Sequence, residues 1–431
     1  MTAQGTKFYG WILVGTFFGI YFVNATFPYY GASVLNAYMV EALGLDRSAL
    51  GLGFSAFSLS VGLASPVVAY CISKKGVRFT LSCGGLIIAL GSLLMALLVT
   101  TTWHYVLVFG VIVGTGVSVG GVIPIQTGVT LWFRRRKALA MSIVLSATGI
   151  GALVATPLLN KVVSAFDGNW RAGWFLVMAA ALLAVVLAAA GVRNSPAELG
   201  QVPDGRPADA DPATASSRKV AANGRVFQSD ENWQVRQAVR TRTFWLIIIA
   251  AIAYLGPFNA CVAHGVIYLK DLGHSRDLAA LSLGLLVVSS LIGRLLAGAL
   301  GDRLEPRIVW SVAQISILAG TIALIHATGS ALVYLYAVLV GAGMGSAFVC
   351  MPTILGNYFG PQSFAPIMGI VFPVSMIVGG LAPLAAGIVY DHQGSYATAF
   401  YGLAALAFLG GVLVMQAKPP VPAFVPQPSV A

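Results

Sequence analysis

Charge is what this 431-residue sequence has least of. Only 9% of its residues are Asp, Glu, Lys or Arg, whereas globular domains carry roughly 25%. Hydrophobic residues make up 58% of the chain, and the mean hydropathy is +0.85. Because so few charged groups cannot cover the surface of a water-soluble fold, the composition indicates a polytopic membrane protein.

Motifs for enzymatic chemistry are missing as well. The four cysteines, at positions 71, 83, 261 and 350, fall inside apolar segments without metal-ligand spacing, so they are expected to be small buried hydrophobic residues. The sequence has no nucleotide-binding motif. No Ser/His/Asp set, metal cluster or pair of carboxylates can be assembled inside an apolar segment. These absences argue against an enzyme, an ATP-driven pump and a protein that holds a metal or other cofactor.

What the sequence has instead is long apolar stretches. A bilayer span needs roughly 20 apolar residues, and twelve segments qualify, which predicts an all-α membrane protein with twelve transmembrane helices. Six of them precede a polar stretch at 193–242 and six follow it. They are expected near 9–35, 49–72, 79–100, 104–131, 138–162, 172–192, 243–269, 278–300, 307–327, 331–356, 364–389 and 395–416.

The basic residues predict the orientation. A net charge of +11 could suggest nucleic-acid binding, but Lys and Arg stand in short breaks between the apolar stretches, where membrane topology places them. Of the 25 basic residues, 19 fall in or at the edge of one set of alternate loops, five fall in or at the edge of the other, and only Arg294 falls in the interior of a span. This excess predicts a multi-pass protein of the cell (inner) membrane with both termini in the cytoplasm. Lipid phosphate is a secondary partner for the basic loops.

The polar stretch in the middle of the chain divides in two. Residues 195–217 are rich in Pro, Ala and Asp and are expected to be disordered. Residues 229–242 are predicted to form an interfacial helix capped by Ser229. The expected organisation is therefore a six-helix bundle over 1–192, a cytoplasmic loop over 193–242, a second six-helix bundle over 243–418 and a disordered tail over 419–431.

The two halves of the chain repeat each other. Trp132-Phe133 before span five corresponds to Tyr358-Phe359 before span eleven, at an offset of about 226 residues. Related Gly-containing turns precede spans six and twelve at the same offset. A six-plus-six repeat is typical of transporters in which two bundles enclose a central cavity, with the substrate near the midplane.

The turn after span eight, Gly298-Ala-Leu-Gly-Asp302-Arg303, is similar to the signature of the major facilitator superfamily, and the resemblance covers almost the whole chain. The superfamily implies two six-helix bundles that work by alternating access. It makes Asp302 and Arg303 candidates for a conformational gate. Pro373 in span eleven is expected to mark a bend or gate of its own.

Within the superfamily, the chain resembles the branch of monocarboxylate porters and oxalate/formate antiporters. It departs from that branch because span eight has no acid beside its arginine, span one has no lysine and span eleven has no basic residue. Four motifs carry the resemblance: Gly10-Trp11 in span one, the glycine-rich span four with its Trp132-Phe133-Arg-Arg-Arg136 turn, His264 ahead of Lys270-Asp271-Leu-Gly273 in span seven, and Ile292-Gly293-Arg294 in span eight.

Arg294 is the sharpest functional signal. An arginine inside a membrane helix costs several kcal/mol, so it must face water, a counter-ion or a ligand. No predicted span contains Asp or Glu, and the guanidinium fork matches a carboxylate bidentately. The other interpretation is that Arg294 snorkels towards the surface near Asp302.

Further polar groups at depth are candidates for the cavity wall. His264 could donate a hydrogen bond to the substrate or carry a proton, or it could be a neutral histidine satisfied by a neighbouring helix. Each of the others could line the cavity or bond a neighbouring helix, and Tyr334 and Tyr336 cannot both share one helical face. These candidates are Asn24, Gln126, Asn259, Tyr334 and Tyr336.

These features predict a secondary transporter of small organic anions, with monocarboxylates resembling lactate or pyruvate as the leading substrate class and protons as a possible coupling ion. One alternative is an exchanger of the oxalate/formate type. Another is an exporter of drugs or neutral solutes from the same superfamily, although a buried uncompensated cation would repel cationic drugs. A membrane receptor is a third class, but the loop at 193–242 is too short for an output domain.

Overall fold

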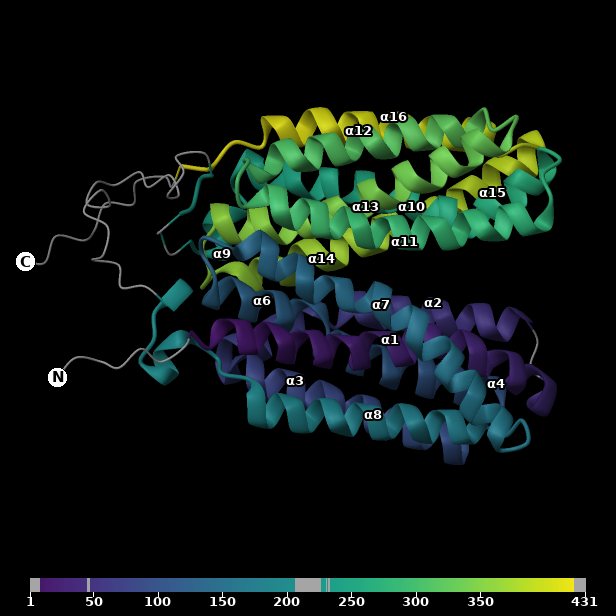
Figure 1. Ribbon diagram of the computed structural model, residues 1–431, viewed down its shortest axis with the longest axis horizontal. Coiled ribbons are helices and arrows are strands. Elements are labelled where there is room, and N and C mark those ends of the chain that lie inside the picture. Colours follow the sequence, from purple (N-terminus) through teal and green to yellow (C-terminus); the bar gives the residue numbers. More distant parts are fainter. Residues whose placement is uncertain (1–7, 45–46, 206–225, 230, 232, 422–431) are drawn as a thin grey trace, which may run out of the picture.

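The computed structural model describes residues 8–44, 47–205, 226–229, 231 and 233–421, and helices dominate this part of the chain (Figure 1). The first half comprises α1 (Gly10–Leu43), α2 (Arg47–Leu63), α3 (Ser65–Leu98), α4 (Thr102–Tyr105), a π-helix (Val106–Val113), α5 (Gly114–Val119), α6 (Val122–Trp132), α7 (Lys137–Ala165) and α8 (Trp170–Gly191). The second half comprises α9 (Val235–Ala238), α10 (Arg242–Asp271), α11 (Arg276–Gly301), α12 (Pro306–Ile325), α13 (Ser330–Tyr358), α14 (Phe364–Gly380), α15 (Ala382–Gln393) and α16 (Ala397–Gln416).

These helices account for twelve spans. Among the described residues, eleven helical segments are long and apolar enough to cross a bilayer, and Ala49–Leu63 of α2 is a shorter apolar helix. The second predicted span is divided between α2 and the start of α3, whose chain turns at Gly76 with φ 81° and ψ 173°. Only glycine adopts that backbone conformation readily. The predicted all-α membrane fold is confirmed.

The fourth span is broken where its glycines lie. α5 ends at Val119 and α6 begins at Val122, with Gly120 and Gly121 in non-helical conformations between them. A Cβ atom on Gly84 of α3 would lie 2.0 Å from the backbone nitrogen of Gly120. The backbones of the two spans therefore touch, which is the close packing that small residues permit in membrane helices.

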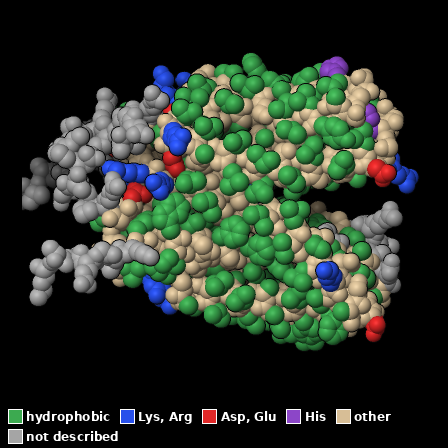
Figure 2. All heavy atoms as spheres, viewed as in Figure 1, with side chains coloured by type: hydrophobic (Ala, Val, Ile, Leu, Met, Phe, Trp, Pro, Cys, Tyr) green, Lys and Arg blue, Asp and Glu red, His purple; other side chains and the backbone are tan. Residues whose placement is uncertain are grey.

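The two halves lie side by side, and both described ends of the chain lie at one end of the bundles, which we call the terminal end (left in Figure 1). A single buried apolar cluster joins the halves at that end, with members from α1, α6, α7, α13 and α14. Two further clusters each belong to one half alone. As a consequence, the halves are in contact at the terminal end and a cleft separates them at the opposite end (Figure 2).

Apolar side chains cover the sides of the molecule. Leu63, Val67 and Tyr70, for example, are 60–64% exposed. The Lys, Arg, Asp and Glu side chains visible in Figure 2 gather mainly at the two ends. This distribution is the one that a hydrocarbon environment requires, because ionised groups are costly at bilayer depth.

The central loop differs from what its sequence predicts. Disorder over 195–217 is wrong for the described part, since Pro196–Leu199 and Pro203–Gly205 form short 3-10 helices; residues 206–217 lie outside the described residues. The long helix expected over 229–242 is also wrong. Within the described residues of this range, only the single turn of α9 precedes α10, and Thr241 rather than Ser229 caps α10.

Tertiary hydrogen bonds explain why the predicted helix is absent. The amide of Phe227 donates to Glu305 at 3.1 Å, and the amide of Ser229 donates to the carbonyl of Asn357 at 2.7 Å. The Gln228 side chain donates to the carbonyl of Arg134 in the first half at 2.7 Å. These residues therefore cross the terminal end in an extended form. In the tail, residues 419–421 have no regular structure and the rest lies outside the described residues.

Candidate anion site at the seam between the halves

α7 and α11 form the seam that holds the site. The carboxylate of Asp302 accepts hydrogen bonds from the amides of Ala138 and Leu139 at 2.8 and 3.0 Å. Further along the seam, a Cβ atom on Gly149 would lie 3.5 Å from Leu291. The two helices therefore stay in contact from the terminal end to about the middle of the span, and Arg294 lies between these two points.

The structure places Arg294 at the interface rather than at the surface. Its side chain is 6% exposed, and Nη1 donates to the carbonyl of Leu145 at 2.5 Å and to the hydroxyl of Thr148 at 2.6 Å. Both acceptors belong to α7 of the other half. Nε has no hydrogen-bond partner. The snorkelling interpretation is therefore wrong, because Arg294 reaches across the seam and not towards Asp302.

Aromatic side chains surround the guanidinium. Its Cζ lies 5.2 Å from the ring centre of Phe348 on α13, within the range of a cation–π contact. Tyr21 and Tyr30 on α1 and Tyr254 on α10 lie close enough to interact with it electrostatically. Among the described residues, no carboxylate lies within ion-pair distance of Arg294. Arg294 thus holds a buried positive charge with neutral ligands, which is an arrangement suited to a bound anion.

Two other predicted residues lie deep in the first half. Asn24 is fully buried and donates from Nδ2 to the carbonyl of Gly120 at 3.0 Å, so it satisfies a backbone acceptor at the break between α5 and α6. Gln126 on α6 is also fully buried, and neither atom of its side-chain amide has a partner. A buried amide without partners is costly, which makes Gln126 a candidate for binding a ligand or water.

His264 lies far from Arg294 along the membrane normal. It follows Tyr254 on α10 by ten residues, which is roughly 15 Å at the rise of an α-helix. Its Nε2 lies 2.9 Å from the carbonyl of Pro383, and its ring stacks on Tyr396 at 4.8 Å. Nδ1 is buried without a partner. A carbonyl can only accept, so Nε2 carries a proton.

Asn259, Tyr334 and Tyr336 do not gather around Arg294 either. Asn259 Nδ2 donates to the carbonyl of Gly379 at 3.3 Å within the second half. Tyr334 is 40% exposed, whereas Tyr336 is buried against Gly265 and Ser282. Ser282 precedes Arg294 by twelve residues on α11, or roughly 18 Å. The predicted residues are thus spread over the length of the second half.

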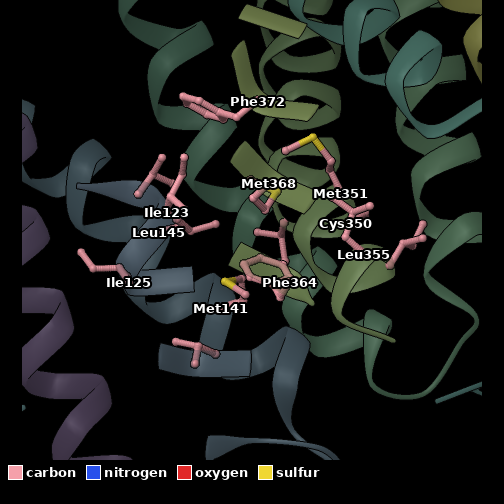
Figure 3. Close-up of a cluster of buried hydrophobic side chains, with 14 of the residues drawn as sticks. Ile123, Ile125, Met141, Leu145, Cys350, Met351, Leu355, Phe364, Met368 and Phe372 are labelled. Atoms are coloured by element: carbon pink, nitrogen blue, oxygen red, sulfur yellow. The ribbon is translucent and has the colours of Figure 1, made fainter. Parts of the chain in front are cut away.

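The terminal end is closed by an apolar plug. Figure 3 shows Ile123 of α6 and Met141 and Leu145 of α7 beside side chains of α13 and α14 from the other half. Leu145 belongs to this plug and its carbonyl also accepts from Arg294. Arg294 therefore lies at the inner edge of the closed region. The side chains from the other half are Cys350, Met351, Leu355, Phe364, Met368 and Phe372.

Polar contacts reinforce the plug at its outer edge. Lys137 is 3% exposed, and its Nζ donates to Asn357 of the other half at 2.9 Å. Asp302 is the cap of the first turn of α7, where a carboxylate faces the positive end of the helix. Burial raises the pKa of Asp302 from 3.8 to about 6. The neighbouring Arg303 is exposed and lies in the turn that ends α11.

Pro373 lies inside α14, which continues past it. The break in this span comes later, between α14 and α15 at Leu381, with Pro383 in the first turn of α15. The backbone of Pro373 lies against Gly62 of α2, in the other half. Its gating role remains a prediction.

Sequence reasoning missed the groups that surround Arg294. The sequence does not single out Thr148 or Leu145 as partners of Arg294. Both lie on another span, hydroxyl residues such as Thr148 are common there, and every residue has a backbone carbonyl. A signal was present for the tyrosines, since Tyr21 and Tyr30 fall inside span one and Tyr254 falls inside span seven. Nothing in the sequence tells which helix faces Tyr21 or Tyr254.

A family model described as Major Facilitator Superfamily matches residues 13–379 and 246–429. The chain belongs to the Major Facilitator Superfamily. It is therefore a membrane transporter of small molecules and not an enzyme. The resemblance inferred from the sequence motifs is confirmed.

Curated superfamily relatives are distant but cover most of the chain. Monocarboxylate transporter 13 of Bos taurus is 27% identical over 370 residues, which cover 82% of this chain and 78% of that protein. Monocarboxylate transporter 2 of Homo sapiens is 22% identical over 418 residues, which cover 94% and 85%.

Solved structures of the superfamily share the fold. The crystal structure of FucP in the outward conformation has a TM-score of 0.70 at 17% identity, covering 95% of this chain and 99% of that one. The proton:xylose symporter XylE has a TM-score of 0.68 at 15% identity, covering 95% of each chain.

Proposed function

We propose that this transporter moves small organic anions, with monocarboxylates as the substrate class, and that Arg294 binds the carboxylate. The observation that carries the proposal is the buried guanidinium at the seam, held by neutral acceptors and without a carboxylate partner among the described residues. A substrate carboxylate would supply the missing negative charge and form charge-assisted hydrogen bonds. The monocarboxylate transporters among the relatives support this substrate class.

Alternating access follows from the two ends of the molecule. The apolar plug closes the terminal end, and the cleft in Figure 2 opens at the other. With the termini in the cytoplasm of a cell-membrane protein, as the distribution of Lys and Arg predicts, this state faces outward. Substrate would enter the cleft, reach Arg294 at the edge of the plug and leave after the halves rock about the site.

Uptake into proteoliposomes tests the proposal. Labelled lactate, pyruvate, formate and oxalate are offered to the wild type, Arg294→Ala and Arg294→Lys. Arg294→Ala should abolish uptake of every carboxylate, a loss of at least roughly 100-fold if two charge-assisted hydrogen bonds disappear. Arg294→Lys should remain badly impaired, because a point charge does not reproduce the planar fork.

Arg276→Ala is the matched control. It removes the same charge from the exposed start of the same helix, α11, and should keep nearly full uptake. Size-exclusion profiles and thermal unfolding show whether each variant is folded. Wild-type uptake by well-folded Arg294→Ala would overturn the role of Arg294 in carboxylate binding. Uptake of neutral solutes alone would instead favour the neutral-solute exporter.

A further inference from the structure

A cavity at the terminal end of the second half lies outside the transport path. It has a volume of about 430 Å³ and lies between α9, the start of α10 and the segment after α16. Its polar wall consists of Trp233, Gln237, Arg240, Thr241, Arg242 and Thr243. The path through Arg294 does not use these residues.

Among the described residues, the wall of this cavity carries two positive charges and no negative one. Arg242 donates from Nη2 to the neutral side chain of Gln416 at 2.9 Å, so that contact leaves its charge uncompensated. Arg240 is exposed, and its guanidinium has no acceptor within the described residues. The described wall therefore favours an anion.

Backbone and side-chain donors complete the wall. Arg242 and Thr243 begin the 30-residue helix α10, and the first amides of a helix have no acceptor within it. The positive end of the helix dipole adds to their attraction for an anion. Trp233 is only 6% exposed, and its indole N–H has no acceptor in the described part of the chain. Amides, guanidinium groups and an indole are the donors that a phosphate group needs.

The depth of the cavity identifies the source of the phosphate. α10 enters the membrane at Arg242, and Trp245 one turn into the helix is 53% exposed, with its Nε1 bonded to the carbonyl of Val239 at 2.9 Å. Exposed tryptophans of this kind mark the headgroup level of a bilayer. The cavity therefore lies where phospholipid phosphates lie.

We propose that this cavity binds the phosphate of an anionic phospholipid in the leaflet at the terminal end. The two arginines neutralise the headgroup, and the first amides of α10 donate hydrogen bonds to its oxygens. A zwitterionic lipid would bind less well, because its ammonium group would meet the same arginines. Free inorganic phosphate offers the same chemistry from a soluble source, and the test separates the two.

Lipid binding to the purified full-length protein tests the proposal. Native mass spectrometry counts retained lipid after incubation with phosphatidylglycerol or with phosphatidylcholine. The wild type should retain phosphatidylglycerol preferentially. Arg240→Gln should weaken that retention about fivefold, and adding Arg242→Gln about fivefold again, because each basic residue near an anionic surface contributes a factor of this size. Because Arg240 is exposed and has no described partner, its replacement leaves the fold intact.

Arg276→Gln, which changes the same charge at the other end of the molecule, is the control and should bind lipid as the wild type does. Equal retention by the double variant and the wild type would overturn the proposal, as would an equal loss in Arg276→Gln. Inorganic phosphate at millimolar concentration is added as a competitor. If the wild type binds inorganic phosphate but does not retain phosphatidylglycerol in preference to phosphatidylcholine, the site binds phosphate but the lipid source is overturned.

Discussion

At the scale of the residue, the proposed role of Arg294 would connect ligand binding with the contact between the halves. Its two hydrogen bonds go to Leu145 and Thr148 across the seam. Nε has no partner among the described residues, so a carboxylate can bind there and, as a charged acceptor, draw the guanidinium away from Leu145 and Thr148. Binding of the anion would then loosen the contact between α7 and α11 and allow the halves to move.

The single cation also predicts charge selectivity. Arg294 can neutralise one carboxylate, and a second carboxylate would be left without a partner in a poorly solvated cavity, at a cost of several kcal/mol. Competition assays should therefore rank lactate-like and aromatic monocarboxylates above oxalate and malonate. The measurement is inhibition of labelled lactate uptake by the wild type. Stronger inhibition by the dianions would contradict the prediction and favour the oxalate/formate type of exchanger.

At the scale of the element, the first turn of α7 is a latch between the halves. Asp302 from the other half caps it, and Lys137 at its start bonds Asn357. The groups that act electrostatically on Asp302 are Lys137 and Asp204. When the terminal end opens, the carboxyl of Asp302 becomes hydrated and its pKa falls back towards 3.8.

This difference predicts that low pH favours the closed terminal end. The pKa of Asp302 is about 6 when buried, so the closed state binds more protons than the open one, and its share rises as pH falls from about 7 towards 4. A spin-label or fluorophore pair across the terminal end would measure that share. Asp302→Asn should remove the dependence on pH, because an amide does not titrate in this range. An unchanged pH response in Asp302→Asn would assign the effect to another group.

At the scale of the whole molecule, the two ends differ in what holds them. A continuous apolar cluster and several polar bonds close the terminal end, while each half has its own core near the cleft. Opening the terminal end requires the plug in Figure 3 to separate. The energy for that step must come from the new contacts that form when the cleft closes around substrate.

We also propose that transport is coupled to protons, which is a property at this scale because a coupled proton would move with the substrate between the two ends. His264 lies roughly 15 Å along α10 from Tyr254 and bonds Pro383, so the substrate carboxyl at Arg294 is the nearer carrier. His264→Gln should therefore keep gradient-driven accumulation within about twofold of the wild type, because the proposed carrier is unchanged. A factor of two corresponds to less than 1 kcal/mol.

The measurement uses vesicles with and without an imposed pH gradient and follows accumulation and exchange separately. His326→Gln, at an exposed histidine bonded to Tyr401, is the control. Loss of accumulation with exchange preserved in His264→Gln alone would make His264 the proton carrier. A wild type that ignores every proton gradient would leave facilitated diffusion or exchange.

The sequence by itself determined the membrane environment, the number of spans and the presence of an arginine in the interior of a span. Each of these features follows from the local sequence alone. Apolar runs of sufficient length must lie in lipid, and an arginine among them must find a polar partner. Asp302 could be singled out as a candidate for a conformational gate because its turn resembles the superfamily signature. The positions of these residues along their own spans agree with the structure.

Only the tertiary structure decided what Arg294 touches. Its partners, from Leu145 to Phe348, come from spans far apart in the chain, and helices that are apolar on every side carry no pattern that says which face meets which neighbour. The helix predicted in the central loop was wrong for a related reason. The amides of Phe227 and Ser229 donate to tertiary acceptors and not to carbonyls of a local helix. Which end of the molecule is closed depends on the same long-range packing, since one sequence must support both the closed and the open arrangement of its two halves.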